Sequence, residues 1–474
     1  MLKKSLRPIP MLLCTIAGLV AAFVVLFPRL FESILSNHFY GYSIVLFFIS
    51  VGIVLGIVHR SSVFSPSLFL LIFFIAVPVF GPANARQFFD EVTYYFGRDM
   101  PSFDFPTFLW SVGTVSFFGG VLLAWLLLPR SKRNYKVLWD RKRMLLFLKI
   151  SLLLAFFGTL LAFYRIGYVP FLRSDIGDVR TGYFNTVGPL TSRFSMHWPV
   201  PALLSSMLFF LERGKKRLMY LCLTIICAMG MLFYAQRTGF VWIITAFGLL
   251  YVKFSRPRPL RLLAIAGIAF LLVYGMMIQA EHRGALPSDG ATISSRITKH
   301  TFSEWSQYSI VVNEARSGSD YLGWKIFVGP FFTLVPRQIY DLLGYDKGAL
   351  IMEYSAVYHY GREFDELYGI RIGPIGEAFA AYGFGGVILQ MTVLGIFFGV
   401  FERTYFGLEK NDARLCVVCY LLSLMLHLPI TTMFMLLVPL TVTGVFIFAY
   451  YIFGTRKDNR IPSEGRGSNI PVVG

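Results

Sequence analysis

Long apolar runs recur along this chain and constrain its fold more than any other feature. Each run has roughly 20 residues, about the length with which a helix crosses the ~30 Å hydrocarbon core of a bilayer. The runs are apolar on every side, whereas a helix of a soluble protein would alternate apolar and polar faces. Since 56% of the 474 residues are apolar, we expect an all-α, polytopic membrane protein.

The hydropathy pattern predicts about twelve membrane-spanning helices. The first apolar run follows MLKKSLR without a small-residue cleavage pattern, so it is expected to be a retained span rather than a signal peptide. The sixth span is short and is expected to begin earlier, near Ser195. The predicted spans are 10–27, 40–58, 65–82, 108–128, 145–164, 199–212, 218–234, 240–254, 262–280, 376–400, 415–431 and 433–454.

Basic residues are concentrated in the short loops on one side of these spans, which the positive-inside rule assigns to the cytoplasm. Both termini are therefore expected to be cytoplasmic. The net charge of +18 is explained by this topology, and a nucleic-acid partner is not predicted. The basic segments are MLKKSLR, PRSKRNYKVLWDRKRM, RGKKR, SRPRPLR, RTYFGLEKNDAR and GTRKDNR.

The same topology divides the chain into four parts. Residues 1–280 carry the first nine spans with external loops at 83–107 and 165–198, and residues 281–375 form a large external loop that contains short helices. Residues 376–454 carry the last three spans, and residues 455–474 form a cytoplasmic tail.

Two features of the large external loop indicate contact with the membrane or a ligand. Its apolar stretch 326–343 is interrupted by Pro330 and Pro336, so an interfacial or re-entrant helix is expected there. Its many aromatic residues, Trp305 and Tyr308 among them, are expected either in an interfacial belt or stacked on sugar rings.

Several kinds of chemistry are not predicted. The sequence has no Walker loop, no GxGxxG after a plausible strand and no large cytoplasmic segment to bind a nucleotide. All five cysteines fall inside predicted spans, and the loop acids form no DxD or HExxH pattern. We therefore expect no cofactor and no metal, and the energy or the activated group must be supplied in another way than by a nucleotide bound on the cytoplasmic side.

The outer side differs from the cytoplasmic side in its choice of cation. It carries fourteen arginines and only three lysines. Arginine offers a planar fork of donors that suits phosphate, whereas a merely solvated surface has no such preference. Arg237 lies in the short turn AQRTGF at the outer rim, where a charge marks a functional site by default. Ion pairing, as in RSDIGDVR, explains individual external arginines equally well.

Four local segments give this chain a resemblance to the Wzy-type O-antigen and oligosaccharide repeat-unit polymerases. They are QRTG at 236–239, RSDIGDVRTGYF at 173–184, VPRQIYDLLGYDKG at 335–348 and RIGPIGEAFAAYGFGG at 371–386. Some family members have an arginine, ten residues and a glycine in each of two external loops. Arg362 and Gly373 fit that spacing, but no arginine of the 165–198 loop does.

The resemblance implies a GT-C-like polytopic glycosyltransferase at the periplasmic face of the bacterial inner membrane. Undecaprenyl-diphosphate-linked oligosaccharides would be both donor and acceptor, and the implied partners are membrane lipids and a chain-length-regulating co-polymerase. An inverting, metal-independent transfer needs arginines for the leaving diphosphate and a general base for the acceptor hydroxyl. The expected diphosphate- and glycan-binding residues are Arg173, Arg180, Arg237, Arg337, Arg362, Arg371, Tyr358 and Tyr360.

The general base is expected to be Glu377 or His359, with His282 and His300 as weaker candidates. The motif GPIGE places Glu377 in the first turn of a predicted span. Two explanations account equally well for a glutamate at this position. One is a favourable interaction of its carboxylate with the helix dipole. The other is that Glu377 and Arg371 together form one wall of a binding site for an anionic ligand. The glycines that follow would permit close helix packing or the approach of a lipid.

Three other functions remain open at this stage. An O-antigen ligase would share the donor and the arginines but use a different acceptor. A polysaccharide flippase or transporter would need charges in mid-span and paired repeats, of which the sequence shows little. A scaffold of a secretion machine would not need the bias towards arginine.

Overall fold

The computed structural model of this protein describes most of the predicted spans. The described ranges are 38–60, 65–87, 102–127, 135–139, 141–170, 197–232, 237–255, 304–318, 321–325, 337–345, 372–410, 412–427 and 454–458, with a few single residues between them. The predicted spans 10–27, 262–280 and 433–454 lie outside the described residues, apart from Gly444 and Gly454.

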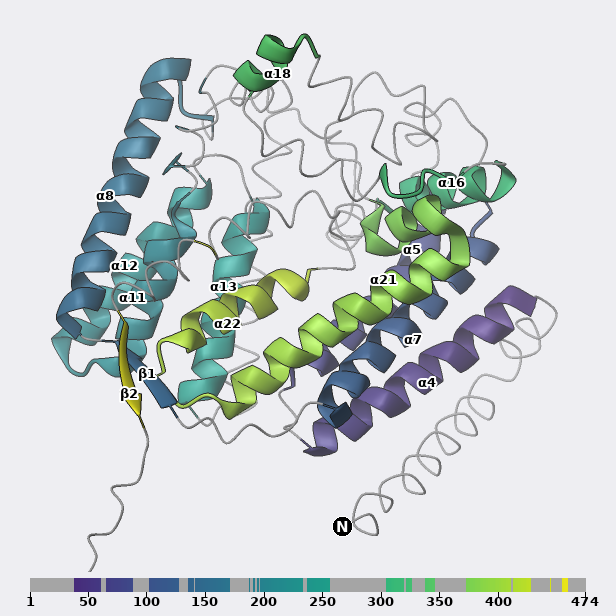
Figure 1. The fold of residues 1–474 in the computed structure, drawn as a ribbon, viewed down its shortest axis with the longest axis horizontal. Helices are drawn as coiled ribbons and strands as arrows, with labels where there is room; N and C mark the ends of the chain where they lie inside the picture. The colour runs from purple at the N-terminus through teal and green to yellow at the C-terminus, as the bar shows by residue number, and fades with distance from the viewer. Residues whose placement is uncertain are drawn as a thin grey trace, which may run out of the picture.

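The described chain is helical, with one small sheet (Figure 1). The helices are α4 (His38–Arg60), α5 (Pro66–Gln87), α7 (Asp104–Leu127), α8 (Arg141–Ile166), α11 (Pro199–Leu211), α12 (Lys215–Leu232), α13 (Arg237–Phe254), α16 (Glu304–Ser317), α18 (Arg337–Leu343), α21 (Gly373–Gly407) and α22 (Arg414–Met425). The strands are β1 (Tyr135–Trp139) and β2 (Gly454–Asp458).

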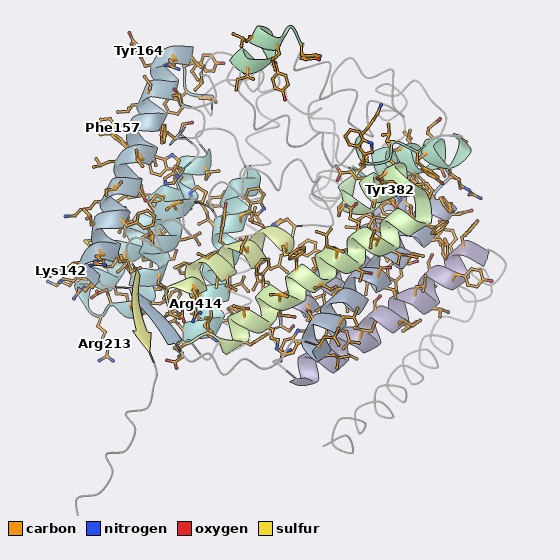
Figure 2. The ribbon with its side chains drawn as sticks, viewed as in Figure 1. Lys142, Phe157, Tyr164, Arg213, Tyr382 and Arg414 are labelled. Carbon is orange, nitrogen blue, oxygen red and sulfur yellow. The ribbon has the colours of Figure 1, made fainter. Side chains whose placement is uncertain are left out.

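Within these ranges four helices, α4, α7, α8 and α21, are long and apolar enough to cross a membrane. Shorter apolar helices occur in α5, α11, α13 and α22. Apolar side chains such as Leu153, Phe156 and Phe157 are exposed along α8, as expected of a surface that faces lipid (Figure 2). The chain is therefore a helical membrane protein.

Two span boundaries differ from the sequence prediction. The helix in the sixth predicted span, α11, begins at Pro199 with Trp198 as its N-cap, and it does not extend back to Ser195 because His197 lies outside helical structure. Pro199 suits the first turn of a helix, because a backbone N–H at that position would have no acceptor within the helix and proline lacks this N–H. The span predicted at 376–400 is part of a longer helix, α21, which is broken near its start.

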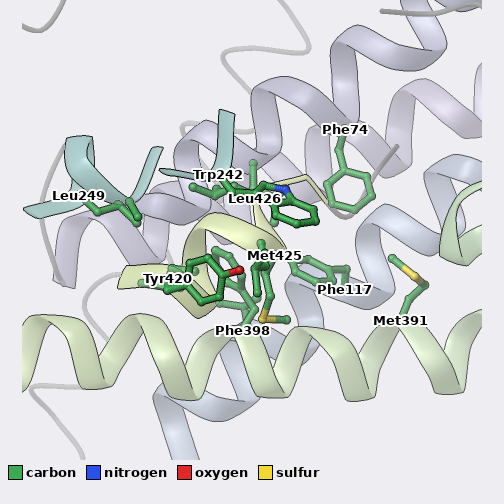
Figure 3. Packing of buried hydrophobic residues seen from close by; sticks show 14 of the residues in the cluster. Phe74, Phe117, Trp242, Leu249, Met391, Phe398, Tyr420, Met425 and Leu426 are labelled. Atoms are coloured by element: carbon green, nitrogen blue, oxygen red, sulfur yellow. The ribbon is translucent and has the colours of Figure 1, made fainter. Parts of the chain in front are cut away.

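The core is centred on α7 and α21, which approach each other closely through glycines. A Cβ at Gly395 would overlap the carbonyl oxygen of Phe117, and one at Gly120 would overlap that of Thr392. Small residues at such a crossing let two backbones approach within van der Waals contact. Phe117, Phe398 and Met391 fill the space beside this crossing (Figure 3).

A tryptophan of α7 also compensates for a proline in α5. Pro78 lies inside α5 and has no N–H, so the carbonyl of Phe74 four residues earlier loses its helical partner. The indole Nε1 of Trp110 donates a hydrogen bond of 2.9 Å to that oxygen. The proline-containing helix is thus tied to the core because its free carbonyl is satisfied there.

The described parts of the segments that the sequence assigns to the cytoplasm lie at one end of the bundle, which we call the basic end (Figure 1). There β1 pairs antiparallel with β2, from Tyr135 opposite Asp458 to Trp139 opposite Gly454. The sequence analysis did not predict this sheet in its two basic segments. The strands link the loop before α8 to the C-terminal segment, so these two segments lie on the same side.

Basic side chains at this end satisfy the last carbonyls of three helices. Lys253 donates to the carbonyls of Tyr405 and Phe406 near the end of α21, at 2.8 and 3.2 Å. Lys410 donates to Phe254 at the end of α13, and Arg403 donates to Ala124 and Trp125 near the end of α7. Cations are favourable there because the last carbonyls of a helix lack partners and carry partial negative charge.

Glu402, the residue before Arg403, accepts four hydrogen bonds although it is fully buried. The donors are the Ser65 hydroxyl, the N–H and hydroxyl of Ser67, and the Trp125 indole, at 2.5 to 3.1 Å. Ser67 lies in the first turn of α5, so the carboxylate accepts from a backbone N–H that lacks a helical partner. Glu402 therefore joins α5 and α7 to α21.

Replacing Glu402 with alanine should destabilise the protein by roughly 3 kcal/mol, because buried donors would lose their acceptor. The measurement is the temperature at which detergent-solubilised protein loses its monodisperse elution peak. Glu409→Ala, which removes an exposed acid near the end of the same helix, is the control and should change stability by about 1 kcal/mol or less. Equal stability of the two variants would contradict this role for Glu402.

Candidate functional site

The predicted membrane helix that begins near Gly373 is interrupted at Tyr382 and Gly383. Tyr382 has φ −145° and ψ 21°, and Gly383 has φ 63° and ψ −147°, so residues 373–381 and 384–407 form two separate helical segments. We call residues 373–381 the half-helix. Glycine is required at 383 because a side chain disfavours this positive φ.

Backbone donors from the segment 321–325 satisfy the carbonyls that the break leaves without helical partners. Leu322 N donates to Ala380 O at 3.0 Å, and Gly323 N donates to Ala381 O at 2.9 Å. The ring of Tyr321 lies against the Cα of Gly383. Irregular backbone at membrane depth is tolerated where other protein groups satisfy it in this way.

The half-helix folds back against the rest of α21. The Gln390 amide Nε2 donates to Pro374 O at 3.3 Å, although a straight helix would separate these residues by about 24 Å along its axis. A Cβ at Gly386 would overlap the carbonyl oxygen of Ala378, so the two limbs touch through backbone. Tyr382 marks the tip of this hairpin (Figure 2), and the N-terminus of the half-helix lies about 12 Å back from it, beside Gln390.

Other helices enclose the half-helix, and all nine of its residues are buried. Ile375 lies against Gly113 of α7, and Gly376 lies against the ring of Tyr308 of α16. Phe379 packs edge-on against Phe105, at 5.5 Å between ring centroids. The half-helix is therefore an interior element and does not face lipid.

Glu377 is buried on this interior element, with 5% of its surface exposed. The sequence analysis placed Glu377 in the first turn of the helix. That placement is wrong, because the helix begins at Gly373 and Glu377 lies in its second turn. The helix dipole acts mainly within the first turn, so a dipole interaction alone explains this buried carboxyl group less well.

Several polar atoms in the enclosing helices are buried and have no hydrogen-bond partner within the described chain. They are Thr107 Oγ1 of α7, Trp305 Nε1 and Ser309 Oγ of α16, and Gln390 Oε1 of α21. Buried polar atoms are almost always hydrogen-bonded, so such a group of exceptions calls for an explanation. A water molecule or a ligand would satisfy such atoms.

Two aromatic residues expected at the membrane interface or on sugar rings are instead part of the core. Trp305 and Tyr308 each pack against Trp110, at 5.4 Å between ring centroids. The Tyr308 hydroxyl donates to Pro106 O at 3.0 Å, and burial raises the pKa of this hydroxyl well above its usual value. Tyr308 is therefore a protonated anchor that holds α16 on α7.

Comparison with protein-family models, with curated proteins and with solved structures finds no match to this chain.

The remaining predicted site residues are described in part or lie outside the described residues. Arg237 and Arg337 are the first residues of α13 and α18, and only their backbone is described. Those outside the described residues are Arg173, Arg180, Tyr358, His359, Tyr360, Arg362 and Arg371. Arg371 directly precedes Ile372, the N-cap of the half-helix, so the chain itself keeps it near that N-terminus.

Three further observations concern the sequence predictions. Among the described residues no group of three His, Cys, Asp or Glu side chains could hold a metal ion. Sequence reasoning missed Gln390, although a lone amide in the apolar run 384–400 is a signal that could have identified it. In the predicted stretch 326–343 the described part is α18, whose Leu342 and Leu343 are exposed, as expected of a helix at the membrane interface.

Proposed function

We propose that this protein is a glycosyltransferase that polymerises undecaprenyl-diphosphate-linked oligosaccharide repeat units at the periplasmic face of the bacterial inner membrane. The proposal includes the predicted topology of about twelve spans, a GT-C-like arrangement and cytoplasmic termini. Its product would be an O-antigen or a related surface polysaccharide.

The observation that carries the proposal is the position of Glu377. Its carboxyl group is buried on a half-helix, directly after the arginine-rich external segment that resembles the Wzy-type polymerases. This half-helix packs against the start of α7, whereas the basic end lies at the other end of α7. A buried carboxyl group on the side opposite the basic loops supports chemistry on the outer side of the membrane.

The proposed reaction is a direct displacement. An acceptor hydroxyl oxygen attacks the anomeric carbon of the donor, and the bond from that carbon to the diphosphate oxygen breaks with inversion. Glu377 or His359 takes the hydroxyl proton, and the diphosphate leaves with the polyprenyl lipid. The leaving charge is stabilised by arginines drawn from Arg173, Arg180, Arg237, Arg337, Arg362 and Arg371, and Tyr358 and Tyr360 contact the glycan.

The direct test is an assay on the purified protein in a lipid nanodisc. Incubation with an undecaprenyl-diphosphate-linked repeat unit should give a ladder of products that differ by one repeat unit. Transfer of one glycan to a lipid A core, without a ladder, would identify a ligase. Absence of any product with authentic donor and acceptor would refute the proposal.

A transporter of lipid-linked glycans is the second candidate, because one observation favours it. Discontinuous helices with buried polar groups are a recurring feature of transporter binding sites, and α21 is such a helix. The two functions are separated by proteoliposomes that contain a fluorescent lipid-linked oligosaccharide. Movement of the label across the bilayer without a change in its size would favour transport.

Replacing Arg237 with lysine should remove most of the polymerising activity, while the protein still inserts and folds. Lysine keeps the charge but loses the planar fork that binds phosphate through two hydrogen bonds. The measurement is the yield of the ladder per amount of monodisperse protein. Arg316→Lys is the matched control and should keep near-normal activity, since the Arg316 guanidinium lies over the Phe105 ring at 4.2 Å. Normal activity of Arg237→Lys would show that Arg237 only anchors the helix at the membrane rim.

A further inference from the structure

Two runs of exposed basic residues meet at one corner of the basic end. One run opens α8, and the other forms the turn between α11 and α12 (Figure 2). We call these residues the basic corner: Arg141, Lys142, Arg143, Arg213, Lys215, Lys216 and Arg217. All seven are exposed, and one acid directly precedes each run in the sequence, Asp140 before Arg141 and Glu212 before Arg213.

Two contacts hold the basic corner together. Arg141 forms an ion pair of 2.8 Å with Glu212, which fastens the start of α8 to the end of α11. The Arg217 guanidinium lies over the Phe209 ring at 4.6 Å, so α12 is held to α11 at the same place. The positive charges therefore belong to a defined surface and not to separate loops.

Exposed apolar side chains follow the basic corner directly along both helices. Leu146 lies one turn into α8, and Leu218 and Met219 lie in the second turn of α12, with 51%, 64% and 54% of their surfaces exposed. A band of cations beside a band of apolar surface matches a phospholipid, whose phosphate lies at the level of the cations and whose acyl chains lie beyond them.

We propose that the basic corner binds the headgroups of anionic phospholipids from the surrounding membrane. The choice of an anionic lipid follows from the charge, since a zwitterionic headgroup would gain little from seven bases flanked in the sequence by only two acids, Asp140 and Glu212. Arginine and lysine both donate to phosphate oxygens, and Arg141 and Arg217 are already oriented by their protein contacts. This surface is separate from the half-helix, so the proposal is independent of the proposed function.

The test titrates acyl-labelled phosphatidylglycerol into the purified full chain in a neutral detergent, with labelled phosphatidylcholine as the reference lipid. Phosphatidylglycerol should bind roughly tenfold more tightly or better. The variant Arg213→Gln/Lys215→Gln/Lys216→Gln should reduce that affinity by about tenfold or more, while it leaves the Arg141–Glu212 and Arg217–Phe209 contacts in place. Lys215→Gln/Lys216→Gln serves the same purpose if the triple variant does not fold.

A matched control removes the same charge from the opposite side of the predicted topology. Lys299→Gln/Lys325→Gln/Lys347→Gln should bind phosphatidylglycerol within about twofold of the original protein. Three results would overturn the proposal: unchanged binding in the basic-corner variant, an equal loss in the control variant, or full displacement of the lipid by inorganic phosphate. The last result would indicate a site for free anions instead of a lipid surface.

Discussion

Replacing Glu377 with glutamine should abolish polymer formation while leaving the protein folded. Glutamine keeps the size and polarity of this buried side chain but cannot take a proton from the acceptor hydroxyl. A positioned general base typically accelerates such a transfer by ~10²–10⁴-fold, so the yield of the product ladder should fall by at least about 100-fold. The measurement is ladder yield in nanodiscs per amount of monodisperse protein.

Glu402→Gln is the matched control, because it is the same substitution at a second buried glutamate of the same helix. The four groups that donate hydrogen bonds to Glu402 are structural contacts of the basic end. The Glu402→Gln variant should therefore lose stability but keep its activity per folded molecule. Full activity of Glu377→Gln together with an inactive His359→Ala would assign the base to His359. Full activity of both variants would show that neither Glu377 nor His359 is the general base.

Replacing Gly120 with alanine should destabilise the protein by about 2–3 kcal/mol, whereas Gly119→Ala should not. A Cβ at Gly120 would overlap the Thr392 carbonyl oxygen and approach Ile396 N at 3.0 Å, and helical backbone cannot move aside as a flexible side chain can. A Cβ at Gly119 would meet nothing within 4 Å.

The two substitutions share the same gain in helix propensity, up to about 1 kcal/mol, so their difference isolates the contact between α7 and α21. The measurement is the thermal midpoint of the detergent-solubilised protein, compared with that of the unsubstituted chain. If both alanine variants behaved alike, α7 and α21 would not approach each other closely at Gly120.

The sequence predicted the long helices because their signal is local. Each predicted span from 40–58 to 240–254, and those at 376–400 and 415–431, contains a helix, since a long apolar run needs no other information to be recognised. The break at Tyr382 and Gly383 was not predicted, although the glycines around it were noticed. The break depends on donors from Leu322 and Gly323, which only the folded chain brings to it.

The candidate site was predicted in part for the same reason. Glu377 was identified as a charged residue in an apolar run, but its burial and the Gln390 contact depend on the fold-back of the half-helix. The roles of Glu402 and Arg403 were missed because the predicted span ended at residue 400. The convergence of the external arginines on Glu377 remains a prediction, since most of them lie outside the described residues.

The pairing of β1 with β2 has a consequence for biosynthesis. During translation β1 leaves the ribosome early, whereas its partner is made only after all the helices described here. The two strands can therefore pair only after the later segments of the chain have reached the same side of the membrane as β1. A disulfide formed by an added oxidant between cysteines placed at Val137 and Arg456, which face each other in the register, would thus report on completed insertion. A chain stalled before its last helices would leave β1 without its partner strand.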